Sequence, residues 1–119
     1  MLFRSNDTAT TEIYTLHYTF PTRRSSELRA ARALVRDAAK ALDEKAPDVA
    51  MQCAMAKRFA TDAGSRIANE ALQLHGGYGY LHEYGIEKVV RDLRVHQILE
   101  GTNEIMRVII GRELLGAVR

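Results

Sequence analysis

The sequence has 119 residues, with 17 lysines and arginines against 15 aspartates and glutamates, a single cysteine and no tryptophan. This length suits about one domain, and 46% apolar with 27% charged residues excludes a fully disordered or fibrous chain. A net charge of +2 argues against a nucleic-acid binder, one cysteine excludes a disulfide framework, and no apolar run approaches the ~20 residues of a membrane span.

Residues 1–28 differ in composition from the rest of the chain. Six of the eight threonines lie here, whereas all eight glycines and fifteen of the sixteen alanines follow. The apolar residues have neither helical nor strand spacing, and Asp7, Glu12 and Glu27 depart from the acid-poor pattern of a transit peptide. A common sequencing-library adapter, read as protein, resembles NDTATTEIYT (6–15), PTRRSS (21–26) and LFRS (2–5). We therefore interpret residues 1–28 as a translated artefact, with a native disordered tail as the alternative.

Two helices are expected next. Apolar residues recur every three or four positions from Leu28 to Leu42, which predicts an amphipathic helix with Ala31, Leu34, Val35 and Ala38 on its stripe. A longer helix is expected from about Pro47 to His75, ended by two glycines. Its stripe is rich in alanine, so a neighbouring helix should approach closely. That stripe consists of Val49, Cys53, Ala56, Ala60, Ala63, Ile67, Ala71 and Leu74.

The remaining sequence predicts a loop and two further helices. GYGYLHEYG (77–85) is typical of a loop, and a helix is expected over 86–94 with Val89 and Val90 facing inward. The last helix should begin near Thr102, whose hydroxyl can cap free amide groups, and its stripe consists of Ile105, Val108, Ile109 and Leu115. Since no strand pattern is present, the expected fold class is all-α, a partial four-helix bundle with antiparallel helices and short connections.

Glu100 is the residue with the clearest chemical potential, because it lies just before the N-terminus of the last helix. A carboxylate that apolar neighbours such as Ile98 and Leu99 shield from water can accept a proton near neutral pH and act as a base. The alternative is an ordinary solvated loop glutamate, stabilised by the helix dipole.

Other candidate features favour structural roles. HGGYG (75–79) neither follows a strand nor opens a helix, so a helix-terminating turn is favoured over a phosphate cradle. Three nearby tyrosines suit either packing or stacking on a planar ligand. Cys53 fits a small buried hydrophobe. No metal site is expected, because the histidines have no further ligands at suitable spacing.

Residues 59–107 closely resemble the C-terminal α-helical domain of acyl-CoA dehydrogenases. The resemblance rests on three motifs in a fixed order, which are QLHGGYGY, VVRD and QILEGTNEIMR. It extends over about residues 29–119, and the details are most similar to the isobutyryl-CoA, branched short-chain type. We therefore place an incomplete domain of this kind at 29–119, after the segment 1–28.

The resemblance implies FAD-dependent α,β-dehydrogenation of a short or branched-chain acyl-CoA to the trans-2-enoyl-CoA. Glu100 matches the family's base, which removes the α-proton while the β-hydrogen leaves as hydride to N5 of FAD. Gly101 matches a position beside the substrate, where a missing side chain leaves room for the acyl group. The positions that match FAD contacts are Thr102, Asn103 and Glu104, and also Gln73, Leu74, His75, Gly76 and Gly77, which in the family contact FAD bound mainly to a neighbouring subunit.

The resemblance also implies partners and an incomplete extent. Electron-transferring flavoprotein is the expected electron acceptor, and the full-length enzyme is expected to be a homodimer or homotetramer. The family's N-terminal helical and middle β-domains have no counterpart here, so the chain alone is expected to be inactive. No targeting signal is visible, which suggests the cytoplasm in a bacterium or the mitochondrial matrix in a eukaryote. The alternatives are an acyl-CoA oxidase-like relative and a cofactor-free helical interaction module.

Overall fold

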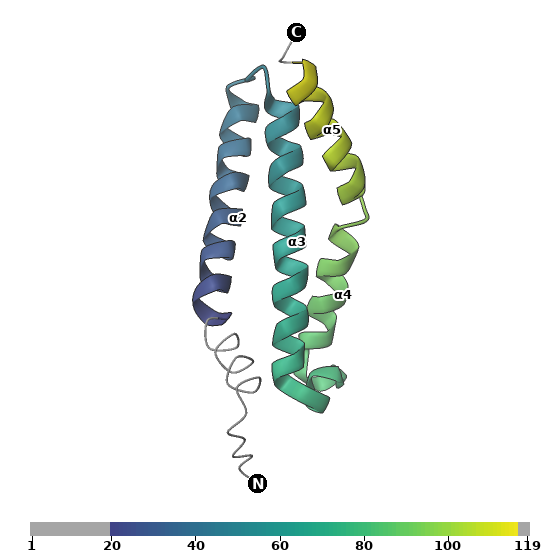
Figure 1. Ribbon diagram of the computed structural model, residues 1–119. Helices are drawn as coiled ribbons and strands as arrows, with labels where there is room; N and C mark the ends of the chain where they lie inside the picture. The colour runs from purple at the N-terminus through teal and green to yellow at the C-terminus, as the bar shows by residue number, and fades with distance from the viewer. Residues whose placement is uncertain (1–19, 117–119) are drawn as a thin grey trace, which may run out of the picture.

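The computed structural model describes residues 20–116, which form four α-helices and two short 3-10 turns. Helices α2 (Phe20–Asp43) and α3 (Val49–His75) form an antiparallel pair (Figure 1). Helices α4 (Ile86–His96) and α5 (Asn103–Gly116) follow one another along the other side of α3 (Figure 1). The described part of the chain contains no strand, so the all-α partial bundle is confirmed.

Helix α2 packs only on α3, since none of its Cα atoms in the described chain comes within 8 Å of α4 or α5. It begins at Phe20, eight residues before the expected start, so the expected start at Leu28 is wrong. Ion pairs fix this early part of the helix, because Arg24 lies 2.6 Å from Glu70 on α3. The buried positions are Ala31, Ala38 and Ala41, whereas Leu28, Val35 and Leu42 are exposed. The origin of residues 1–28 stays a prediction, and residues 1–19 lie outside the described chain.

Helix α3 is central because the three other α-helices and the turn at 76–80 pack against it. It begins two residues after Pro47, which lies in the preceding turn. Four alanines are buried along it, and small residues at these positions let the neighbouring helices approach closely. They are Ala54, Ala56, Ala63 and Ala68. Only Ala56 and Ala63 belong to the predicted stripe, and its last member, Leu74, is exposed. The helix ends at His75, and Gly76 follows with φ +60°, which confirms the predicted helix stop.

The segment after α3 folds back onto the end of that helix. Its two 3-10 turns, η1 (Gly76–Tyr80) and η2 (His82–Tyr84), occupy most of the expected loop. Helix α4 extends two residues further than expected, and the inward orientation of Val89 is wrong, since its exposure is 44%. Within residues 20–116, no helix combines the length and apolar character needed to span a bilayer.

Helix α5 begins beside Thr102, and the predicted cap is confirmed. The Ile105 amide donates to the Thr102 hydroxyl over 3.4 Å, and the Met106 amide donates to the Thr102 carbonyl over 3.0 Å. The predicted apolar stripe is wrong, because the face toward α3 buries Asn103 and Met106 instead. Three of the four predicted stripe residues are exposed, and these are Ile105, Val108 and Leu115.

Candidate active site

Glu100 lies on a short turn between α4 and α5 with an unusual backbone. Its φ is +53°, and Gly101 follows with φ +92°, so two consecutive residues lie in the left-handed region. For a residue with a side chain, this conformation costs on the order of 1 kcal/mol. Such strain persists only where surrounding contacts fix it, and it is found at functional sites. Glu100 is therefore an exposed residue whose backbone conformation is constrained.

The carboxylate of Glu100 is not shielded within this chain. Glu100 is exposed, and the exposures of Ile98 and Leu99 are 51% and 36%. The expectation that these two neighbours desolvate the carboxylate is therefore wrong for the described residues. A dry environment for Glu100 requires a surface supplied from outside them.

Glycine is favoured at position 101 by the backbone conformation there and by a neighbour in α5. A Cβ atom built on Gly101 would lie 2.7 Å from the terminal methyl group of Met106, which is buried. The space beside the glycine is thus filled from within the chain. This is a different reason for glycine from the one that the family resemblance implies, and the predicted contact with substrate remains untested.

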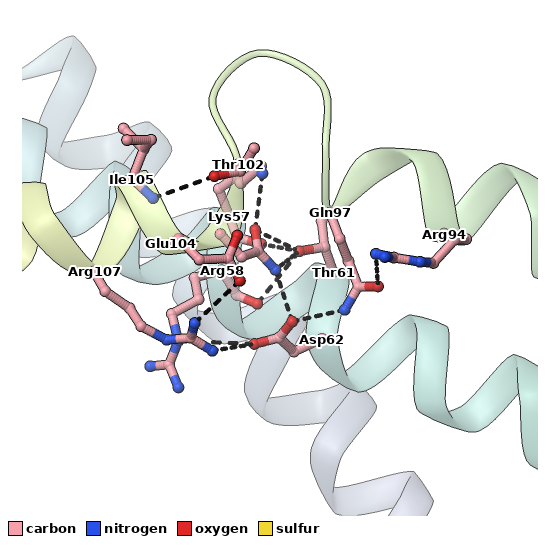
Figure 2. A network of polar contacts seen from close by, with 11 residues as sticks. Lys57, Arg58, Thr61, Asp62, Arg94, Gln97, Thr102, Glu104, Ile105 and Arg107 are labelled. Carbon is pink, nitrogen blue, oxygen red and sulfur yellow. Dashed lines mark hydrogen bonds and ion pairs between the residues drawn. The ribbon is translucent and has the colours of Figure 1, made fainter.

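A network of polar contacts ties this turn to α3 (Figure 2). At its centre is Asn103, whose exposure is only 3%. Its amide nitrogen donates to Thr61 Oγ1 over 2.8 Å and to Asp62 Oδ1 over 2.7 Å. Its amide oxygen accepts from Lys57 Nζ over 2.8 Å, and the same ammonium group donates to the Gly101 carbonyl over 2.7 Å. The acid on one side and the ammonium on the other fix the orientation of the amide group.

Asp62 belongs to the same network and links it to both ends of the connection between α4 and α5. Gln97 Nε2 donates to Asp62 Oδ1 over 2.7 Å. The backbone carbonyl of Gln97 accepts from the backbone amide of Asn103 over 3.0 Å. Arg58 and Arg107 lie 3.7 and 3.8 Å from the second carboxylate oxygen of Asp62. The carboxylate thus has partners from α3, from α5 and from the connection after α4.

Sequence reasoning missed Lys57, Thr61, Asp62 and Gln97. The first three lie about 40 residues before the turn, and nothing in local spacing links them to it. One local signal was available, because Lys57 and Thr61 lie four residues apart and therefore on the same side of a helix.

The start of α5 also has a distinct electrostatic environment. The pKa of Glu104 is lowered from its ordinary value of 4.5, first by its own backbone amide, then by the Thr102 hydroxyl and by Arg107. These donors favour the ionised carboxylate, as expected for an acidic residue in the first turn of a helix. At the start of α5 the Thr102 hydroxyl thus accepts from the Ile105 amide and donates to the Glu104 carboxylate.

The second predicted group, residues 73–77, lies at the far end of α3. From Thr61, which contacts the turn, to Gln73 there are twelve residues, or about 18 Å along a helix. The structure therefore does not bring residues 73–77 together with residues 100–104 within one chain. His75 Nδ1 lies 2.8 Å from the Ala71 carbonyl. Beside it, Tyr78 and Tyr84 pack against each other with ring centroids 5.3 Å apart.

Comparison with known proteins gives a consistent result. Isobutyryl-CoA dehydrogenase from Bos taurus is 55% identical over 91 residues, and the protein of the same name from Dictyostelium discoideum is 50% identical over 90. In both cases the match covers 76% of this chain and 22% of the relative, so the chain spans about a fifth of these relatives' length.

Solved structures agree with the sequence relatives. Butyryl-CoA dehydrogenase from Megasphaera elsdenii superposes with a TM-score of 0.77 at 34% identity, covering 97% of this chain and 29% of that one. A chain in the structure of the electron transferring flavoprotein of Acidaminococcus fermentans gives a TM-score of 0.78 at 37% identity, covering 86% and 26%. Residues 23–115 match the family described as acyl-CoA dehydrogenase, C-terminal domain. The chain therefore belongs to the acyl-CoA dehydrogenase family and corresponds to its C-terminal domain.

Proposed function

We propose that this chain is the C-terminal part of an FAD-dependent dehydrogenase that converts a short or branched-chain acyl-CoA to the trans-2-enoyl-CoA, with Glu100 as the base. The observation that carries the proposal is the turn at residues 100–101. A constrained backbone at Glu100 reduces the freedom that is lost when the residue meets its substrate, which favours proton transfer in a defined geometry.

The assigned chemistry follows from what each residue of the turn offers. Glu100 accepts the α-proton of the thioester on its carboxylate. Gly101 is proposed to meet the acyl group with its backbone, because the space that its Cβ would occupy is filled by Met106. An α-proton beside a thioester is only weakly acidic, so the base must be dry when it acts. Glu100 is exposed in this chain, and the missing cover is expected from other parts of the enzyme. This is why the chain alone should be inactive.

The residues that match FAD contacts suit such a cofactor. Gly76 and Gly77 are exposed and have no heavy atom within 4 Å of a built Cβ, so a flat polar group can approach the backbone there. Thr102 and Glu104 offer polar groups at the start of α5, whereas the side chain of Asn103 is already fully hydrogen-bonded within the chain. When bound, FAD supplies the two-electron oxidation by taking the β-hydrogen as hydride. Because residues 73–77 lie about 18 Å along α3 from the contact between α3 and the turn, they are proposed to serve the cofactor of a second subunit.

The same proposal covers partners and compartment. Relatives named isobutyryl-CoA dehydrogenase support a branched short-chain substrate, and the structural match to a chain of an electron transferring flavoprotein structure supports such a flavoprotein as acceptor. Relatives include mitochondrial and bacterial proteins, so the compartment is expected to be the matrix or the cytoplasm according to the host. A homodimer or homotetramer is proposed for the full-length enzyme.

The test replaces Glu100 in a full-length enzyme. Residues 23–115 are grafted in place of the corresponding segment of bovine isobutyryl-CoA dehydrogenase, and the graft is compared with its Glu100→Gln variant. We expect the variant to keep FAD and to lose α-proton exchange and turnover by a factor of about 100 to 10,000, the usual contribution of a general base. Glu113→Gln, an exposed glutamate on α5, serves as the matched control and should stay active.

Other outcomes would select a different function. Normal turnover in the Glu100→Gln graft would disprove the assignment of the base. Peroxide formation with acyl-CoA in air would point to an oxidase-like relative. A graft that folds but takes up neither FAD nor acyl-CoA would favour a helical interaction module.

A further inference from the structure

We propose that Lys57 is a positioning residue, which holds the turn carrying Glu100 in its left-handed conformation. The inference rests on the proposed function, since it concerns how the base is presented. It does not require Lys57 to touch substrate or cofactor.

The contacts of Lys57 are unusual for a lysine. Its ammonium group reaches across 44 residues of sequence to donate to the Gly101 carbonyl and to the amide oxygen of Asn103. Both acceptors are neutral, and within the described chain Lys57 forms no ion pair, although Asp62 lies on the same helix. Hydrogen bonds from a charged donor are about twice as strong as neutral ones. The charge of Lys57 is thus directed entirely to the turn and to the first residue of α5.

The position of these two acceptors explains the effect on the turn. One belongs to Gly101, directly after the base, and the other belongs to Asn103, which begins α5. One ammonium group therefore fixes both sides of Thr102 relative to α3. A backbone with positive φ at residue 100 relaxes unless such contacts hold it. Asn103 is itself oriented by Thr61 and Asp62, so Lys57 acts against a rigid partner.

The test uses Lys57→Met, which keeps the apolar stem and removes the ammonium group, in the same grafted full-length enzyme. We expect FAD content and KM to be unchanged while kcat and the rate of α-proton exchange fall by about 10-fold to about 100-fold, as for a small misplacement of a reacting group. A purely structural role would instead reduce FAD content and the amount of folded enzyme. Lys40→Met removes an exposed ammonium group on α2 and should leave all of these values unchanged.

A second measurement covers the case in which Lys57→Met weakens folding of the graft. In the 119-residue chain, amide hydrogen exchange at Asn103, which donates to the Gln97 carbonyl, should accelerate by about 10-fold in Lys57→Met while residues in the middle of α2 stay unchanged. Unchanged kcat in the graft, or exchange that rises equally along the whole chain, would overturn the inference. If Glu100→Gln is inactive but Lys57→Met is fully active, only the role of Lys57 fails. If Glu100→Gln is fully active, the proposed function fails.

Discussion

Gly101→Ala is expected to destabilise the chain, because the turn cannot accept a side chain without strain. An L-residue in a left-handed conformation costs about 1–2 kcal/mol, and φ is +92° at this position. The new methyl group would also lie 2.7 Å from the end of Met106, and moving that flexible side chain off its rotamer costs about 0.5–1.5 kcal/mol. Together these effects predict a loss of about 1.5–3.5 kcal/mol.

The loss is large enough to measure by thermal or urea unfolding, followed by circular dichroism. For a domain of this size, the expected fall in Tm is on the order of 10–20 °C. The matched control is Gly111→Ala in the middle of α5, where a built Cβ has no atom within 4 Å. There the better helix propensity of alanine should stabilise the chain by up to about 1 kcal/mol. Equal stability of wild type and Gly101→Ala would refute the left-handed turn.

Two further changes test the helix start and the packing. Glu104→Gln should lower Tm at pH 7 and leave it unchanged in strong acid. The lowered pKa of Glu104 means that the ionised carboxylate contributes stability above its ordinary value of 4.5, and that this contribution disappears as the pH falls through the folded value; a Tm difference that persists in acid would contradict this. Ala63→Leu should cost about 1–3 kcal/mol by overpacking, because Ala63 is only 2% exposed. The exposed Ala50→Leu should change stability by less than about 0.5 kcal/mol, and equal effects at both positions would contradict the close packing of α3.

The strongest helix was predictable because its pattern was unambiguous. Helix α3 has one long stripe rich in alanine and a glycine stop, and both the helix and its end at Gly76 are confirmed. Helix α5 was different, because Ile105, Val108 and Leu115 make a stripe as regular as the buried one. A helix that is apolar on several sides cannot be oriented by periodicity alone. Burial of the polar Asn103 decided which side faces α3.

The sequence predicted the motif of the candidate site but not the residues that contact it. The motif located Glu100, Gly101 and Thr102, and the cap formed by Thr102 is confirmed. The contacts that hold this motif come from α3 and depend on long-range packing, so Lys57 and Asp62 had no local signature. The early start of α2 was missed because the threonine-rich segment 1–28 lacks helical spacing, yet Arg24 and Glu70 pair across α2 and α3.

Because α2 touches α3 but neither α4 nor α5, the described chain consists of two helical hairpins that share one helix. The two hairpins need not open together. Fraying of α2 from its N-terminal end removes contacts only from one side of α3, while Lys57, Asn103 and the turn remain in place on the other. Substitutions in α2 should therefore have little effect on the position of the Glu100 carboxylate. The position of the proposed base depends instead on a few polar residues of α3 and α5 that contact each other.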